Sequence, residues 1–123
     1  MYEAVNLAKN KYQHFNNKDE NIILELGTNG DFSKEQLDEF IQVFDEANIY
    51  LVTTRVPRDW QNSVNKKMSA AEKEYENVTV INWYNASEGH VEYFEPDGIH
   101  LNHDGVESMV DLIVRDIIDN QIF

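Results

Sequence analysis

The chain has 123 residues, no cysteine, and 10 basic against 23 acidic side chains, which gives a formal net charge of -13. This length suits one domain, the charge disfavours nucleic acids and anionic lipids as partners, and the lack of cysteine excludes disulfides, thiolate metal sites and a cysteine nucleophile. No apolar run approaches the roughly 20 residues of a membrane span, and the first residues lack the basic-then-apolar order of a signal peptide, so we expect a soluble chain.

The first half of the chain alternates between helical and strand patterns. Val5, Ala8, Tyr12 and Phe15 recur at helical spacing and predict an amphipathic helix over residues 2–16. The apolar run 22–26 ends in Gly27, as is typical of a buried parallel strand. Ser33 and Gln36 form a capping-box signature that predicts the start of a second helix. The apolar stripe of that helix consists of Leu37, Phe40, Ile41 and Phe44.

The second half continues the alternation. Residues 49–54 and 78–83 are rich in β-branched and aromatic side chains and predict two more strands. A third helical stripe consists of Val64, Met68, Ala71 and Tyr75. The stripe of a closing helix consists of Val106, Met109, Val110, Ile113 and Ile117. This alternation predicts an α/β fold with one parallel sheet and helices on both faces. Doubly wound sheets usually have about five strands or more, so strands are expected to be missing at the front.

An acid and an imidazole lie three residues apart near the closing helix. Asp97 and His100 belong to the segment Asp-Gly-Ile-His-Leu, and the helix-start signal of residues 102–105 follows directly. An aspartate that accepts a hydrogen bond from one ring nitrogen fixes the histidine tautomer, so that the other nitrogen can take a proton from a nucleophile. The spacing alone is common, and a solvated loop pair explains it equally well.

A second motif, Gly27-Thr28-Asn29-Gly30, follows the first predicted strand. Open α/β sheets gather their ligand groups at the carboxyl ends of the strands. The side-chain amide of Asn29 could donate a hydrogen bond to a developing oxyanion there, and the glycines would allow the backbone to approach closely. The alternative is a plain turn, because Asn-Gly is a favoured turn pair.

These two motifs together resemble the SGNH (GDSL-like) hydrolase family. The resemblance implies a flavodoxin-like three-layer α/β/α sandwich. It also implies that Asn29, with Gly27, forms the oxyanion hole and that Asp97 and His100 complete a catalytic triad. No cofactor is expected for this chemistry.

Three further stretches narrow the likeness. Residues 49–58, 82–84 and 86–90 look like the C-terminal extracytoplasmic domain of Gram-positive peptidoglycan O-acetyltransferases, and the likeness covers roughly residues 20–115. The resemblance implies a membrane-attached parent protein that acts outside the cytoplasm. The substrate it implies is a cell-wall glycan or another acetylated carbohydrate.

The serine nucleophile of that family is absent from this chain. Family members resemble one another in a Gly-Asp-Ser segment near the start of the domain, and none of the five serines here follows Gly-Asp: Ser33, Ser63, Ser69, Ser87 and Ser108. Residues 1–123 are therefore predicted to be one partial domain that lacks the first two strands of the family layout and is inactive alone. The alternative is a pseudoenzyme module that binds glycan or protein without turning it over.

Several other side chains are weaker candidates for substrate binding. Arg55 and Arg58 flank Pro57 after the second predicted strand, where they could contact substrate or simply pair with neighbouring carboxylates. Trp60 could stack against a sugar, whereas Trp83 is predicted to belong to the core.

The sequence also bears on a metal site and on an oligomer. A cluster of possible ligands consists of His90, His100, His103, Asp97 and Asp104, but its spacing matches no metal motif, so no metal is expected. In the family strand order 2-1-3-4-5, loss of the first two strands would leave strand 22–26 as an open edge. An unpaired apolar edge invites pairing, which predicts a homodimer formed by edge pairing or helix exchange.

Overall fold

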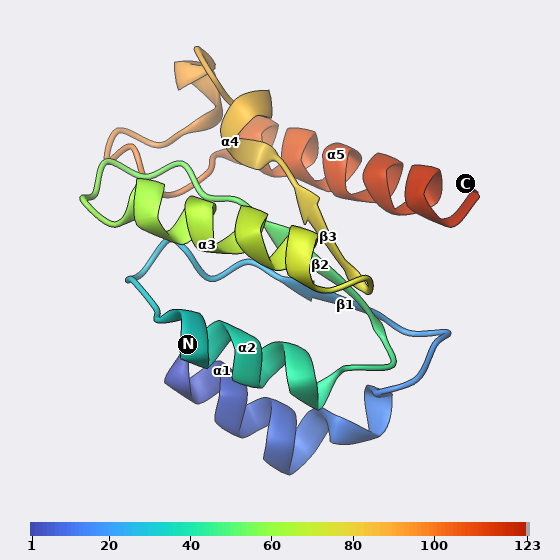
Figure 1. Ribbon diagram of the computed structural model, residues 1–123. Helices are drawn as coiled ribbons and strands as arrows, with labels where there is room; N and C mark the ends of the chain where they lie inside the picture. Colours follow the sequence, from blue (N-terminus) through green and yellow to red (C-terminus); the bar gives the residue numbers. More distant parts are fainter. Residues whose placement is uncertain (123) are drawn as a thin grey trace.

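The computed structural model describes residues 1–122, in which helices alternate with the strands of a parallel sheet (Figure 1). The chain begins with a helical segment made of α1 (Tyr2–Leu7), the π-helical η1 (Ala8–Tyr12) and the 3-10 helix η2 (Gln13–Phe15). The other elements follow as β1 (Asn21–Leu24), α2 (Lys34–Val43), β2 (Asn48–Val52), α3 (Gln61–Glu74), β3 (Val78–Ile81), α4 (Trp83–Ala86), η3 (Val91–Tyr93) and α5 (His103–Ile122). The predicted α/β class is confirmed.

The sheet has the strand order β1-β2-β3, with all strands parallel. Tyr50 of β2 lies opposite Ile23 of β1, and Leu51 of β2 lies opposite Val80 of β3. Because β2 is paired on both sides, its residues from Ile49 to Val52 are fully buried. β1 has a strand neighbour on one side only, which confirms the prediction that the first strand lies at an edge.

Side chains alternate between two hydrophobic clusters, one on each face of the sheet. Ile49 and Leu51 point into the cluster shared with α1, α2 and α3. Tyr50 and Val52 point the other way, into the cluster that contains Met109 of α5. Figure 1 shows the same division, with α2 and α3 in front of the sheet and α5 on the opposite face.

Local signals explain where α2 begins. The Ser33 hydroxyl accepts a hydrogen bond from the Gln36 backbone amide, and the Gln36 side chain accepts one from the Ser33 amide. This reciprocal capping box satisfies two amides that have no partner inside the helix, and it confirms the predicted start. Leu37, Phe40 and Ile41 are buried as their spacing predicts.

The strands are confirmed, but each ends two residues earlier than predicted, at Leu24, Val52 and Ile81. Thr53 and Thr54 stay buried after β2, yet the backbone N–H and C=O of Thr54 bond to the side-chain amide of Asn65 and not to a strand. The β-branched composition therefore predicted a strand over residues 53–54, where the structure has a buried segment held by a helix side chain.

Two helical predictions need correction. Tyr12 and Phe15 were expected on the buried stripe of the first helix, but both are exposed, because the π-helical turn of η1 is wider than an α-helical turn and shifts the following side chains around the axis. Val106 and Val110 were expected in the core stripe of the last helix, but both are about half exposed. Within residues 1–122, no helix has both the length and the apolar composition needed to cross a membrane.

Met68 provides a test of the core on the α2/α3 face, since its side chain is fully buried. We expect Met68→Ala to lower the free energy of unfolding by about 2–5 kcal/mol through lost apolar contacts and the cavity left behind. Urea denaturation followed by circular dichroism measures this change. Lys66→Ala, at an exposed position of the same helix, is the control and should change stability by less than about 0.5 kcal/mol. Equal effects of the two substitutions would contradict the burial of Met68.

Candidate active site

The loops that follow the strands lie at one end of the sheet. The loops after β1 and β2 and the loop of residues 94–101 are found at the left of Figure 1, and the turn into α4 follows the upper end of β3. Parallel strands present their carboxyl ends at the same edge, which is where open α/β sheets bind ligands. The motif residues predicted from the sequence therefore belong to one edge of the molecule.

The segment after β2 is held by side chains of α3 and by the turn into α4. The Asn65 amide accepts from the Thr54 N–H at 2.8 Å and donates to the Thr54 carbonyl at 2.9 Å. Gln61 accepts from the Val56 N–H at 2.8 Å. The Thr53 hydroxyl accepts from the Tyr84 N–H at 2.9 Å. Every one of these bonds satisfies a backbone group, so the course of this buried segment is closely specified.

The Gly27–Gly30 loop packs directly on that segment. A Cβ atom on Gly27 would lie 2.6 Å from Thr54 Cγ2, so only glycine fits. Trp60 Nε1 donates a hydrogen bond to the Gly27 carbonyl at 2.8 Å, and the Trp60 ring packs against the core. Trp60 thus supports the loop backbone, while Asn29 is exposed at its tip.

Asp97 and His100 lie in a tight loop of residues 94–101. An antiparallel bridge between Phe94 and Leu101 closes the loop, and the Glu95 N–H donates to the His100 carbonyl at 2.8 Å. Gly98 has φ of 70°, a left-handed conformation that favours glycine. The turn therefore brings the carboxylate and the imidazole together within one short stretch of chain.

The Asp97 carboxylate accepts three hydrogen bonds. His100 Nδ1 lies 2.6 Å from Oδ2, and the backbone N–H groups of Ile99 and His100 donate to Oδ1 at 2.8 and 3.0 Å. The His100 hydrogen bond, followed by those two backbone bonds, lowers the pKa of Asp97 from 3.8 to about 2. An ionised carboxylate only accepts, so Nδ1 carries the proton and Nε2 is left as the basic nitrogen. His100 Nε2 makes no hydrogen bond to any of residues 1–122, and its side chain is 77% exposed.

An open cavity of about 660 Å³ borders this loop. Its walls include Arg55, Pro57, Phe94 and Gly98, the last of which lies between the catalytic candidates. The Arg55 guanidinium stacks 4.2 Å from the Tyr84 ring centroid and donates from Nε to Ser87 Oγ at 2.8 Å. The volume and the mostly apolar lining suit a small organic ligand such as one sugar unit.

The two arginines do not pair with carboxylates. Among residues 1–122, neither Arg55 nor Arg58 forms an ion pair, which removes the simplest structural explanation for them. Arg55 lines the cavity, whereas Arg58 is exposed and donates to the Pro57 carbonyl. Arg55 is therefore the better placed of the two to meet a ligand.

A second acid–imidazole pair at the cavity was missed by the sequence reasoning. His90 Nδ1 lies 2.7 Å from Glu92 Oε1, and this hydrogen bond lowers the pKa of Glu92. The His90 ring stacks on Tyr93 at 4.5 Å between centroids, and Tyr93 stacks on the buried Trp83 at 5.8 Å. The sequence analysis names His90 only among the possible metal ligands. Its position two residues before Glu92 is the sequence feature that could have indicated this acid–imidazole pair. Trp83 is buried, as predicted.

The serines and the metal candidates can be placed within the described part of the chain. Ser33 caps α2, and the Ser87 hydroxyl is buried and donates to the Trp83 carbonyl at 2.7 Å. Ser63 and Ser69 lie on α3, and Ser108 lies on α5. Across residues 1–122, no group of three or more histidine and carboxylate side chains is arranged to hold a metal ion.

Comparison with known proteins gives close relatives of one kind. No protein-family model matches the chain. The O-acetyltransferase OatA of Staphylococcus aureus strain NCTC 8325 / PS 47 is 44% identical over 115 residues, and so is that of strain COL. A third staphylococcal protein, provisionally named an O-acetyltransferase, is 45% identical over the same length. The matches cover 94% of this chain and 19% of each relative, so the chain is homologous to a part of these proteins and spans about a fifth of their length.

The close approach at Gly27 leads to a paired prediction. Gly27→Ala should lower the free energy of unfolding by about 1–3 kcal/mol, because the added methyl group would meet Thr54 and Val64. Gly30→Ala is the matched control: no atom lies within 4 Å of the added group, and a change of less than about 0.5 kcal/mol is expected. Thermal or urea unfolding of both variants measures the difference, and similar losses at the two positions would contradict the packing described.

The Asp97 hydrogen bonds predict a carboxylate that titrates near pH 2. Since the folded-state pKa lies below the unfolded one, this group favours folding above about pH 4, and the contribution is lost as the pH falls through about 2. His100→Ala removes the largest cause and should raise the pKa of Asp97 part of the way to 3.8, because the two backbone donors remain.

Carboxyl carbon chemical shifts of Asp97, followed by NMR against pH, test this prediction. His103→Ala is the control, since His103 approaches Glu107 and not Asp97. An unchanged Asp97 pKa in His100→Ala would show that the imidazole does not hold the carboxylate in solution.

Proposed function

We propose that this chain, which is homologous to a part of the staphylococcal O-acetyltransferases, carries the acid–base half of a serine acyltransferase site. The observation that carries the proposal is the Asp97–His100 pair: a fixed carboxylate, a protonated Nδ1 and a basic, accessible Nε2. This is the arrangement that a general base needs beside a hydroxyl nucleophile.

In the proposed reaction, His100 Nε2 accepts the proton of a serine hydroxyl as the serine oxygen bonds to an acetyl carbonyl carbon. The tetrahedral oxyanion forms beside Asn29 and the backbone of Gly27, and it collapses as the leaving oxygen takes the proton from His100. A sugar hydroxyl of cell-wall peptidoglycan then attacks the acetyl-serine, again with His100 as the base. In this second step the sugar hydroxyl gives its proton to His100 Nε2, and His100 then gives a proton to the departing serine oxygen, which restores the serine and yields the acetylated sugar.

The proposed substrate site is the cavity beside the Asp97–His100 loop. Arg55 is fixed by Tyr84 and Ser87 at its wall, so its remaining N–H groups can orient a substrate oxygen with little loss of side-chain entropy. Arg58 and Trp60 both belong to the turn that leads into α3. Arg58 is exposed and could contact substrate, and Trp60 supports the Gly27 loop.

The serine of this reaction is proposed to come from outside the chain. Ser33 and Ser87 are engaged in structural hydrogen bonds, and none of the five serines follows a Gly-Asp pair. The parent activity, in a membrane-attached protein at the extracytoplasmic face, would be acetyl transfer to cell-wall glycan. The second candidate function is a module that binds glycan without turnover. The cavity supports this candidate as well as it supports the first, and the lack of a Gly-Asp-Ser nucleophile in residues 1–123 favours it for these residues alone.

We expect the isolated chain to have no His100-dependent esterase activity, because no serine is available to be activated. Release of nitrophenol from p-nitrophenyl acetate, compared between the chain and its His100→Ala variant, measures this. Equal rates are expected. A faster rate that disappears in His100→Ala would show that one of the chain's own side chains is the nucleophile.

Both candidate functions require a glycan-binding site at the cavity, so a binding measurement tests them together. Titration with a soluble peptidoglycan disaccharide, followed by NMR shifts of Arg55 and Gly98, should report binding at the cavity. Arg55→Lys keeps the charge but loses the forked contact to Ser87 and Tyr84, so it should weaken binding by about tenfold. Arg58→Lys is the matched control. An unaltered spectrum at high disaccharide concentration would contradict the glycan site.

A further inference from the structure

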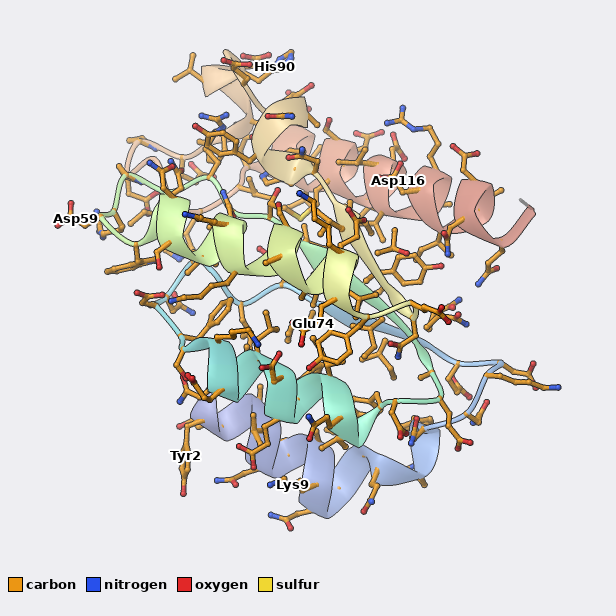
Figure 2. All side chains as sticks on the ribbon, in the orientation of Figure 1. Tyr2, Lys9, Asp59, Glu74, His90 and Asp116 are labelled. Atoms are coloured by element: carbon orange, nitrogen blue, oxygen red, sulfur yellow. The ribbon has the colours of Figure 1, made fainter. Side chains whose placement is uncertain are left out.

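The large apolar side chains left exposed within residues 1–122 are concentrated around the open edge of the sheet. Nine of the ten lie on β1, on the N-terminal helical segment or on α5, and only Val91 lies elsewhere. We call these nine the edge patch: Tyr2, Leu7, Tyr12 and Phe15 of the N-terminal helical segment, Ile23 of β1, and Val106, Val110, Val114 and Ile118 of α5. Figure 2 shows Tyr2 projecting away from the body of the protein.

The α5 part of the patch is a regular stripe that faces the β1 side. Its members recur every four residues and are 48 to 50% exposed. Gln121, three residues after Ile118 and therefore on the same flank, donates a hydrogen bond to the Asn21 side chain of β1. The stripe therefore lies on the side of α5 that faces β1.

The sheet face beneath this stripe is only partly covered. Ile23 and Tyr50 lie opposite each other in the β1–β2 register and point to the same face. Tyr50 is fully buried under α5 and accepts a hydrogen bond from Asn120, whereas Ile23 is 47% exposed. α5 therefore covers β2 and leaves β1 open on this side.

The opposite face of β1 borders a groove. This groove, of about 360 Å³, lies between β1 and the N-terminal helical segment, and Leu7, Tyr12 and Phe15 form its outer wall. The free edge of β1 runs between this groove and the α5 stripe. Parallel strands normally have both faces buried, so an apolar parallel edge with open space on both sides is an incomplete arrangement.

We propose that the edge patch binds a strand–helix segment that lies outside residues 1–123. Its strand pairs in parallel with β1 under the N-terminal helical segment, and its helix lies over Ile23 against the α5 stripe. The partner helix is apolar on that side and cationic beside it, because Glu107 and Asp111 flank the stripe in a chain of net charge -13.

Three observations favour this occupant. The nine side chains are each 38 to 70% exposed, and they include all but one of the large exposed apolar side chains within residues 1–122. In the curated relatives, about four-fifths of the polypeptide lies outside the matched part, which covers 19% of each. A second copy of this chain, which the sequence alone predicts, fits less well. A two-fold axis at the β1 edge would pair the two β1 strands antiparallel, and it would place the N-terminal helical segments of both copies over the same part of the joined sheet.

The proposed pairing has a chemical consequence, which rests on the proposed function. A strand parallel to β1 ends at the same edge as the Gly27–Gly30 loop, so a serine directly after it would lie at the edge of the sheet that also carries Asn29 and the Asp97–His100 loop. The partner would then supply the nucleophile that this chain lacks.

The test uses the whole chain and one defined probe. The probe is a separately produced fragment of S. aureus OatA, the stretch that directly precedes the residues matched here. Native mass spectrometry and titration calorimetry should give a one-to-one complex, and hydrogen exchange should show new protection at Ile23 and along the α5 stripe. Val114→Asp should weaken binding by at least about tenfold, because a carboxylate would be buried without a partner. Asn62→Asp, which adds the same charge at an exposed position of α3, is the matched control.

The outcomes separate this proposal from the proposed function. A complex that hydrolyses p-nitrophenyl acetate, and loses that activity in His100→Ala, supports both. A complex with protection at β1 but no activity supports the docking surface and counts against the catalytic role. The docking proposal is overturned if no complex forms, if Val114→Asp and Asn62→Asp bind alike, or if the chain alone forms a dimer protected at the same residues.

Discussion

The course of the chain after β2 is the constraint on which the candidate site depends. Thr53, Thr54 and Val56 are each about 3% exposed although they belong to no strand, so their backbone groups need partners within the protein. An unsatisfied group of this kind costs about 1–3 kcal/mol. The Ile81 carbonyl of β3 accepts from the Thr53 N–H, while Asn65 and Gln61 of α3 bond to the backbone of Thr54 and Val56, which fixes α3 against the end of the sheet. With this segment in place, Gly27 can pack on Thr54 and Arg55 can reach the start of α4, so two neighbouring loops take their positions from one stretch of backbone.

The Asp97–His100 pair has a different origin, because it is almost entirely local. The bridge between Phe94 and Leu101, the left-handed Gly98 and the two backbone donors to Asp97 all lie within eight consecutive residues. Such a loop can form its acid–base pair without the rest of an active site. The pair by itself therefore shows only that this loop holds a carboxylate and an imidazole together, whereas activity would also depend on groups from other elements.

Sequence reasoning succeeded where the cause of a structure is local or periodic. The capping box predicted α2, alternation predicted the parallel sheet, and the short acid-to-histidine spacing located the pair in one loop. It failed where a partner from elsewhere decides the outcome. Asn65 takes the backbone groups of Thr54 that a longer strand would have paired, and the His90 pair depends on an aromatic stack with Tyr93 and Trp83.

The misplacement of Val106 and Val110 is the most informative of these failures. The apolar face of α5 is wider than the part that the sheet covers. Met109 and Leu112 pack on the sheet, while the α5 stripe lies on the side that faces β1. A helix that needed to bury only one side would carry polar residues at the stripe positions. The same excess of apolar surface appears on the N-terminal helical segment and on Ile23, so three separate elements have sequences suited to more burial than this chain provides. Hydrophobic patterning follows the burial that a segment is selected for, so the apolar excess on these three elements is the pattern that a covering segment of the kind proposed would produce.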